Sequence, residues 1–383
     1  MKLSPSYIDW AQVPSPCFVL DERKLIANLE LMQRVQRESG AQIICALKGY
    51  SVYQTFPLLR KYLAGATASS LHEARLVFEE MGEPAHTYCP AYLEREFDEI
   101  LGYSSHLTFN SLSQWEQYKE RALAAGKSCG IRLNPQYSEV ETDLYNPAIP
   151  GSRLGVTAAA IGDTLPEGIE GIHFHSLCEN DSFVLERTLK VIEEKAGHLL
   201  HQAKWFNMGG GHLMTREGYD HEHLIALLKR IRETYNVDII LEPGSAVGWQ
   251  TGYLKSEVVD LIDSQGVHVA LLDVSVSNHM PDCLEMPYKP HILDGHFEPV
   301  ADKPMYKMGG LTCLAGDYLG DYSFDAPLKV GDRIVFDDMI HYTMVKTTTF
   351  NGVNLPSIGC WTKDDKFVLY RSFGYESYKD RLG

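Results

Sequence analysis

We predict from the sequence a closed (β/α)8 TIM barrel joined to a second, mainly antiparallel β domain. Three observations support this prediction. The chain of 383 residues is longer than a usual single domain. Short apolar runs alternate with longer amphipathic stretches from about residue 40 to 245, which is typical of repeated βα units around a parallel sheet. From about residue 255 the runs become rich in β-branched and aromatic residues, with frequent Gly, Pro and Asp, as in antiparallel β domains.

Eight apolar runs are the expected barrel strands. They cover residues 43–47, 66–70, 86–91, 106–110, 129–134, 171–176, 205–210 and 238–244. The segments 182–202 and 220–235 between them repeat apolar residues every three or four positions, as helices packed on a sheet do. Eight strands with eight crossovers favour a closed barrel. An open doubly wound sheet shows the same alternation and remains the alternative.

The barrel is expected over residues 24–254, and the β domain over residues 1–23 plus 255–383. The run CFVLD at 17–21 precedes the first expected helix, so it can add a strand to the second domain and place both chain ends there. The other strand candidates of this domain are VHVALLDVSV (267–276), KPHIL (289–293), KMGGLTCLA (307–315), DRIVFDD (332–338), YTMVKTTTF (342–350) and FVLYRSFGY (367–375).

The amino-acid composition disfavours some classes of binding partner. Acidic residues outnumber basic ones 51 to 35, for a formal charge of −16, which disfavours nucleic acid and anionic membranes. Such a surface attracts cationic small molecules, although it is also a common route to solubility. The eight cysteines are scattered without C-x-x-C pairs or zinc-type spacing, so we expect no metal site and a reduced compartment. The first residues lack an apolar run of signal length, and we expect a cytoplasmic protein.

Three expected strands end in residues that can carry chemistry, and in a (β/α)8 barrel the working groups lie at these ends. Lys48 follows the first strand, where desolvation lowers the pKa of a lysine and favours the neutral amine that forms imines. His175 ends the sixth strand, where its ring can lie flat against an aromatic ring, and Glu242 ends the eighth. Singly, each has an ordinary structural explanation, as a solvated lysine, a buried histidine or an ion-pair partner.

The seventh strand ends in three glycines, Gly209, Gly210 and Gly211. Successive backbone N–H groups without side chains can cradle a phosphate, although such a run can also be a plain turn. The combination of a lysine, a histidine, a glycine run and a carboxylate at four strand ends favours an active site.

The strings ALKGY, HFHSLCE, NMGGGH and LEPG, followed by GGLTCLAGD and YTMVKTTTFNG, resemble the fold-type III pyridoxal-phosphate decarboxylases, whose barrel is alanine racemase-like. The resemblance covers nearly the whole chain. Within this superfamily, HSLCEN, GGGH, HMPDCLEMPY and GLTCLAGDYLGDY are most similar to carboxynorspermidine (carboxyspermidine) decarboxylases. The resemblance implies pyridoxal 5'-phosphate as cofactor and conversion of carboxynorspermidine or carboxyspermidine to norspermidine or spermidine in polyamine biosynthesis.

The resemblance also implies roles around the cofactor. Lys48 would hold it as a Schiff base, and His175 would stack on its ring. Glu242 would keep the ring nitrogen protonated, which makes the ring an electron sink. Alanine racemase has an arginine there, so a glutamate favours decarboxylation over racemisation. The three glycines and the hydroxyl of Tyr342 would bind the phosphate, and Arg153, taken as a strand-end residue, would steady the region of Lys48.

Cys313 in GGLTCLAGD matches the cysteine that reprotonates the α-carbon in the related decarboxylases. In those enzymes the segment reaches into the partner subunit's site, so the resemblance implies a homodimer with shared sites, to which the β domain contributes. An isolated cysteine is otherwise most often a packing residue.

Substrate recognition is expected to need carboxylates, because the substrate chain carries amines. Asp282 and Asp317 are the candidates for amine contacts, and both can equally be exposed loop acids. At two positions the sequence departs from the family pattern, and both bear on substrate or phosphate contacts. Ser245, a third candidate for substrate binding, stands where ornithine decarboxylases carry an arginine for the phosphate and where polyamine-type relatives are expected to carry an acid. Leu314 stands where ornithine and diaminopimelate enzymes carry an acid after the cysteine, which makes Asp317 the nearest replacement.

Two other functions remain open from the sequence. One is decarboxylation of a shorter basic amino acid, namely ornithine, lysine or diaminopimelate. The other is a non-catalytic pyridoxal-phosphate carrier built from the barrel alone. A carrier needs no second domain, so the residues after the barrel, with Cys313 and Tyr342, favour an enzyme.

Overall fold

The eight expected strands form a closed parallel barrel. The strands are β2 (Gln42–Ala46), β3 (Gly65–Ala68), β4 (Ala85–Tyr88), β5 (Ser104–Phe109), β6 (Ser128–Arg132), β7 (Ile169–His173), β8 (Trp205–Asn207) and β9 (Asp238–Leu241). Each pairs in parallel with the next, and β9 pairs with β2. This computed structural model describes all residues from 1 to 383. The predicted barrel is confirmed, and the open doubly wound sheet is wrong.

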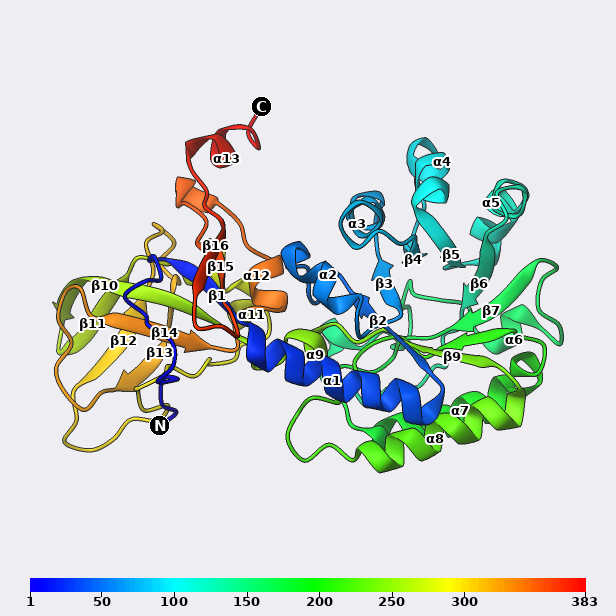
Figure 1. Cartoon of the computed structure of the whole chain (residues 1–383), viewed down its shortest axis with the longest axis horizontal. Helices are drawn as coiled ribbons and strands as arrows, with labels where there is room; N and C mark the ends of the chain where they lie inside the picture. Colours follow the sequence, from blue (N-terminus) through cyan, green and yellow to red (C-terminus); the bar gives the residue numbers. More distant parts are fainter. The chain divides into compact units, whose positions relative to one another are not determined.

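Helices connect successive strands and lie outside the ring (Figure 1). The two predicted helices are α7 (Ser182–Leu200) and α8 (His221–Tyr235), and each begins at an aspartate whose side chain accepts backbone N–H groups of the first turn. The others are α1 (Glu22–Ser39), α2 (Phe56–Leu59), α3 (Leu71–Leu76), α4 (Glu94–Tyr103), α5 (Leu112–Ala124), α6 (Ala158–Ile161) and α9 (Ser245–Gly248), with 3-10 turns at Tyr53–Thr55 and Asp143–Tyr145 and a π turn at Val77–Met81.

Trp205 fills part of the barrel interior, and two glycines make room for it. A Cβ at Gly171 would lie 2.0 Å from the Trp205 ring, and one at Gly130 would lie 2.2 Å from it. The ring meets His106 edge-on, and His106 stacks on His86 with ring centroids 3.8 Å apart. Close packing of this kind leaves no space for an added methyl group.

The rest of the chain forms a mixed, mainly antiparallel sheet. Its order is β13-β12-β11-β10-β1-β15-β16, and β14 also pairs with β10. The predicted strand CFVLD is β1 (Cys17–Asp21), which is antiparallel to β10 (Gly252–Ser264) and parallel to β15 (Ser357–Trp361). The remaining strands are β11 (Val267–Leu272), β12 (Met305–Gly309), β13 (Tyr318–Ser323), β14 (Arg333–Asp337) and β16 (Phe367–Arg371).

Two strand candidates of this sheet are wrong. The run 342–350 begins with a short helix, α12 (Tyr342–Val345), because its backbone bonds locally; beyond this helix the Thr348 N–H donates to the carbonyl of Asn278 and not to a strand. The run 289–293 makes only two isolated bridges, from Ile292 to Phe336 and from Leu293 to Lys2. The other helices here are α10 (Val276–His279), α11 (Pro281–Glu285), α13 (Tyr375–Lys379) and a 3-10 turn at Phe350–Gly352.

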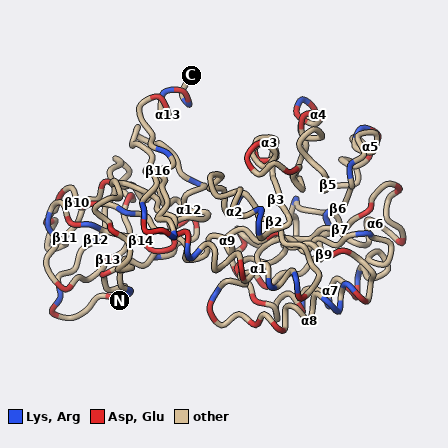
Figure 2. Tube along the Cα trace, in the orientation of Figure 1, with Lys and Arg blue, Asp and Glu red and all other residues tan.

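The chain divides into two compact units. Residues Asn28–Val247 hold the barrel, which we call the barrel unit, and Met1–Ala27 with Gly248–Gly383 hold the sheet, which we call the sheet unit. Acidic and basic residues are interspersed along both units (Figure 2). None of the helices combines the length and the apolar character needed to cross a membrane.

Candidate active site

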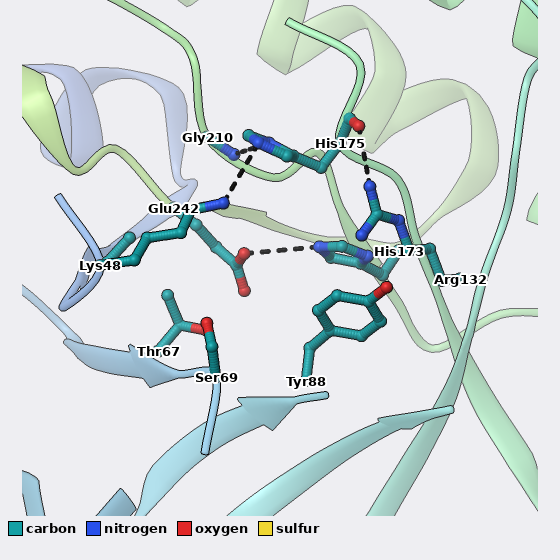
Figure 3. Close-up of a pocket in the computed structure, with 10 residues that line it drawn as sticks. Lys48, Thr67, Ser69, Tyr88, Arg132, His173, His175, Gly210 and Glu242 are labelled. Carbon is teal, nitrogen blue, oxygen red and sulfur yellow. Dashed lines mark hydrogen bonds and ion pairs between the residues drawn. The ribbon is translucent and has the colours of Figure 1, made fainter. Parts of the chain in front are cut away.

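A pocket at the carboxyl ends of the barrel strands brings four predicted residues together (Figure 3). Lys48 follows β2, His175 follows β7, Gly210 follows β8 and Glu242 follows β9. The space among its lining residues measures about 340 Å³, part of which is open to solvent. Its lining is Ala46, Lys48, Thr67, Ser69, Tyr88, Arg132, His173, His175, Gly210 and Glu242.

A directed series of hydrogen bonds links Gly210, His175 and Lys48. The Gly210 N–H donates to His175 Nδ1 at 2.9 Å, and His175 Nε2 lies 3.3 Å from Lys48 Nζ. Burial, with Lys48 and Arg132 nearby, holds the pKa of His175 well below its usual value, so the ring is neutral. A neutral ring whose Nδ1 accepts carries its proton on Nε2. In this tautomer His175 Nε2 can donate to Lys48 Nζ when the amine is neutral.

The electrostatics of Lys48 agree with that assignment. Its side chain is accessible from the pocket, but protein surrounds the amine on several sides. Desolvation and the Arg132 guanidinium lower the pKa of Lys48, while the Glu242 carboxylate opposes them. A lysine amine that loses its proton easily is the nucleophile that an aldehyde requires.

Glu242 is a buried carboxylate held by two neutral donors. Asn207 Nδ2 donates to its Oε1 at 2.7 Å, and His173 Nε2 lies 3.4 Å from its Oε2. Burial alone would raise the pKa of Glu242, but the contact with His173, the Asn207 bond and Lys48 outweigh it and bring the pKa to about 2. Desolvation lowers the pKa of His173, so the ring is a neutral N–H donor and not a cation. Glu242 is therefore ionised at neutral pH.

Arg132 and Tyr88, which pack next to His173 and His175, were not among the residues predicted from the sequence. The Arg132 guanidinium lies 4.7 Å from the centroid of the Tyr88 ring, and its Nη2 donates to the His175 carbonyl at 3.1 Å. The Tyr88 ring stacks on His173 at 5.4 Å, and its hydroxyl donates to Asn110 Oδ1. Two signals were present in the sequence: Arg132 closes β6, and His173 closes β7 two residues before His175.

The glycine run differs from its prediction in one respect. Gly209 and Gly211 have φ of +65° and +85°, and a Cβ at Gly211 would lie 2.1 Å from the Leu177 carbonyl oxygen, so these positions need glycine. The Gly209 N–H, however, donates to Asn207 Oδ1, and the Gly210 N–H donates to His175. The expectation of three successive free N–H groups is wrong, because two of them hold neighbouring side chains.

Two other predicted residues of the barrel unit do not line the pocket. Arg153 is exposed in the loop between β6 and α6 and does not end a strand, which corrects that expectation; its carbonyl accepts from Asn110 Nδ2 at 2.8 Å. Ser245 is buried and begins α9 directly after β9.

The remaining predicted residues lie in the sheet unit. Cys313 is exposed between β12 and β13, and Tyr342 begins α12. Asp282 and Asp317 are buried, so the reading of both as exposed loop acids is wrong. Asp282 Oδ2 accepts the hydroxyls of Tyr288 and Thr343, whereas its Oδ1 has no hydrogen-bond partner.

Comparison with known proteins identifies the family. The model of the family described as "Pyridoxal-dependent decarboxylase, C-terminal sheet domain" matches residues 17–340, and thus parts of both units. The chain belongs to the pyridoxal-dependent decarboxylases. It is therefore an enzyme that uses pyridoxal phosphate to remove a carboxyl group, and the alternative of a non-catalytic carrier is wrong.

Individual relatives are similar over nearly the full chain. A carboxyaminopropylagmatine decarboxylase of Synechocystis sp. is 51% identical over 374 residues, which are 97% of this chain and 96% of that protein. The crystal structure of carboxynorspermidine decarboxylase from Campylobacter jejuni, complexed with norspermidine, is 42% identical, with a TM-score of 0.89 over 96% of this chain and 100% of the other. Diaminopimelate decarboxylase from Helicobacter pylori superposes with a TM-score of 0.82 over 97% and 98% at 17% identity, a likeness of fold.

The pocket fits pyridoxal phosphate chemically. This cofactor has an aldehyde, a ring nitrogen and a phosphate, and when bound it accepts the electron pair left by the departing CO2. The Lys48 amine, whose pKa is lowered by burial, suits the aldehyde, and the ionised Glu242 suits a protonated ring nitrogen. Of the glycine run, Gly210 lines the pocket, so backbone without a side chain is available there for a phosphate.

Proposed function

We propose that this enzyme decarboxylates carboxyaminopropylagmatine. The coarser activity, pyridoxal-phosphate-dependent decarboxylation of a carboxylated polyamine-type substrate, follows from the family and the relatives. The finer choice rests on one observation: the relative with that activity shares 51% of its residues with this chain over almost the whole of both. By its name, the substrate has an amino-acid end that reacts and an agmatine end that carries a guanidinium.

The proposed reaction breaks one bond and forms one. The bond between the α-carbon and the carboxylate breaks, CO2 leaves, and a proton is added to the same carbon. Lys48 anchors the cofactor, Glu242 keeps the ring nitrogen cationic, and His175 covers the ring. Cys313 supplies the proton, from the subunit of a homodimer whose sheet unit contributes to the site. Cys313 is the one exposed cysteine of the chain, as a proton donor that reaches substrate requires.

The roles assigned to the other predicted residues follow from their surroundings. Gly209, Gly210 and Gly211 give the cofactor's phosphate its backbone approach, and we assign the hydroxyl of Tyr342 to the same phosphate. Asp282 is the candidate for the distal cation, because one of its oxygens has no donor. A guanidinium or ammonium would satisfy that oxygen with a charge-assisted hydrogen bond.

Carboxynorspermidine or carboxyspermidine is the second candidate substrate. A carboxynorspermidine/carboxyspermidine decarboxylase of Campylobacter jejuni is 42% identical over 97% of this chain and 99% of that protein. The two kinds of substrate differ at the distal end, where a planar guanidinium replaces an ammonium. The two cations require different hydrogen-bond geometry, so one site does not serve both equally.

Steady-state CO2 release on five substrates, the fifth being diaminopimelate, tests the proposal. We expect the highest kcat/KM on carboxyaminopropylagmatine, a lower value on carboxynorspermidine and carboxyspermidine, and the lowest on ornithine. An anchored distal cation separates long from short substrates, since an unpaired buried carboxylate costs about 1–3 kcal/mol, or roughly tenfold or more in rate. A preference for ornithine or diaminopimelate would reject the assignment. Lys48→Ala is the inactive control, because it removes the amine that anchors the cofactor.

A further inference from the structure

Asp317, at the C-terminal end of the loop that carries Cys313, holds this loop in place by hydrogen bonds. We call residues 310–317 the Cys313 loop. Asp317 is 4% exposed, and its Oδ2 accepts the Thr312 N–H at 2.9 Å and the Thr312 hydroxyl at 2.5 Å. Its Oδ1 accepts the Ser277 N–H at 2.9 Å and the Ser275 hydroxyl at 3.1 Å. The carboxylate thus connects both ends of the loop to α10.

The loop backbone is shaped around this carboxylate. The Gly310 N–H donates to the Asp317 carbonyl at 2.7 Å, which brings the first and last residues of the loop together. A Cβ at Gly310 would lie 2.5 Å from Asp317 Oδ2, so a larger residue there would displace the carboxylate. The close approach of Gly310 and Asp317 is therefore part of the loop's structure.

A second hydrogen bond holds the backbone of Cys313 itself. The Cys313 N–H donates to Asn351 Oδ1 at 2.7 Å. Asn351 has φ of +58°, a conformation that asparagine tolerates better than most residues. The preceding carbonyl, of Phe350, accepts from Asn278 Nδ2 at 2.8 Å. Asp317 and Asn351 therefore both connect the Cys313 loop to the same short segment, Ser275–Asn278.

We infer that Asp317 is a positioning residue for the Cys313 thiol and not a contact for the substrate's amine. With Asn351, it ties the Cys313 loop to Ser275–Asn278. The inference rests on the proposed role of Cys313 as proton donor. An exposed thiol on a free loop would sample many positions, and these hydrogen bonds remove that conformational freedom before the reaction begins.

The hydrogen bonding of Asp317 excludes the amine contact. A carboxylate has about four lone-pair sites, and those of Asp317 already accept four hydrogen bonds. A substrate amine could bind only by displacing one of the donors. Asp282 differs, because its Oδ1 has no donor. The structure thereby separates the two acids into one positioning residue and one candidate for binding a cation.

Hydrogen–deuterium exchange of the holoenzyme without substrate tests the fastening. Asp317→Asn replaces one acceptor oxygen by an NH2 group that faces a donor. We expect the amides of Thr312, Cys313 and Ser277 to exchange about tenfold faster, while β12 and β13 keep their protection. The matched control, Asp364→Asn, removes the same charge at an exposed turn and leaves these amides unchanged. Unchanged exchange in Asp317→Asn would overturn the inference.

A second position covers the case in which Asp317→Asn does not fold. Asn351→Gly keeps the positive φ but removes the acceptor, and Asn351→Asp keeps both. We expect faster exchange of the Cys313 amide in the glycine variant and near-normal exchange in the aspartate variant. If the Cys313 amide in Asn351→Gly is as strongly protected as in the parent, Asn351 does not hold the Cys313 backbone.

Kinetics of the same variants separate positioning from binding. We expect Asp317→Asn and Asn351→Gly to lower kcat about tenfold or more, with KM within about twofold, since the substrate contacts remain. A raised KM with unchanged kcat in Asp317→Asn would assign Asp317 to the amine and overturn the inference. If none of the proposed substrates is turned over, the proposed function fails, while the exchange data still decide whether the loop is fastened.

Discussion

At the scale of single residues, the charge of Glu242 depends on neutral neighbours. His173 Nε2 lies 3.4 Å from the carboxylate, and burial lowers the pKa of its ring, so the ring faces Glu242 without carrying a positive charge. We expect His173→Leu to raise the pKa of Glu242 above its present value of about 2 and to weaken cofactor binding about tenfold or more. Titrating the apoenzyme with pyridoxal phosphate, followed by absorbance, measures this. His173→Gln keeps a donor and should recover most of the affinity; equal affinity in the leucine variant would exclude the role.

At the scale of elements, the sequence predicted strands better than it predicted loops. All eight barrel strands followed from apolar runs, because strands buried on both faces need continuous hydrophobic residues. Lys48, His175 and Glu242 were found because they directly follow such runs. His173 was missed because its contacts with Glu242 and Tyr88 join side chains from different strands. The partners of the glycine N–H groups were missed because they are the side chains of Asn207 and His175, which an apolar pattern does not place. The helix at 342–345 was missed because the aromatic and β-branched residues of its run also fit a strand.

The barrel strands β7 and β8 provide a test at the same scale. Gly171→Ala places a Cβ 2.0 Å from the Trp205 ring, and this ring is 5% exposed and packed against His106, so moving it disturbs its neighbours. We expect a loss of about 1–3 kcal/mol in the free energy of unfolding, measured by urea denaturation. Gly102→Ala in α4, where nothing lies within 4 Å of the added Cβ, is the matched control and should not destabilise the protein. The double variant Gly171→Ala with Trp205→Leu should lose less than the sum of the two single variants.

At the scale of the whole molecule, the stacked pair His86 and His106 makes the fold sensitive to mild acid. Desolvation, with His106 as neighbour, lowers the pKa of His86 to about 3, and burial also lowers that of His106. Both folded-state pKa values lie below that of an unfolded histidine, about 6.5. The unfolded chain therefore binds more protons below pH 6.5, and stability, complete above that pH, is lost as the pH falls toward 3. Protonation of Glu242 acts lower, between about 4.5 and 2.

We therefore expect His86→Gln to flatten the pH dependence between pH 7 and 5, because it removes one group that the unfolded chain protonates and the barrel does not. The difference between the parent and this variant in the change of unfolding free energy over that range should reach up to about 2 kcal/mol, which is the linkage of a single proton over the window from 6.5 to 5. Urea denaturation at both pH values, followed by circular dichroism and by the fluorescence of tryptophan, measures it. His198→Gln, at an exposed position on α7, should retain the slope of the parent. Parallel pH profiles for the parent and His86→Gln would show that the stacked pair does not stay neutral inside the barrel, and would place the origin of the acid sensitivity among the carboxylates instead.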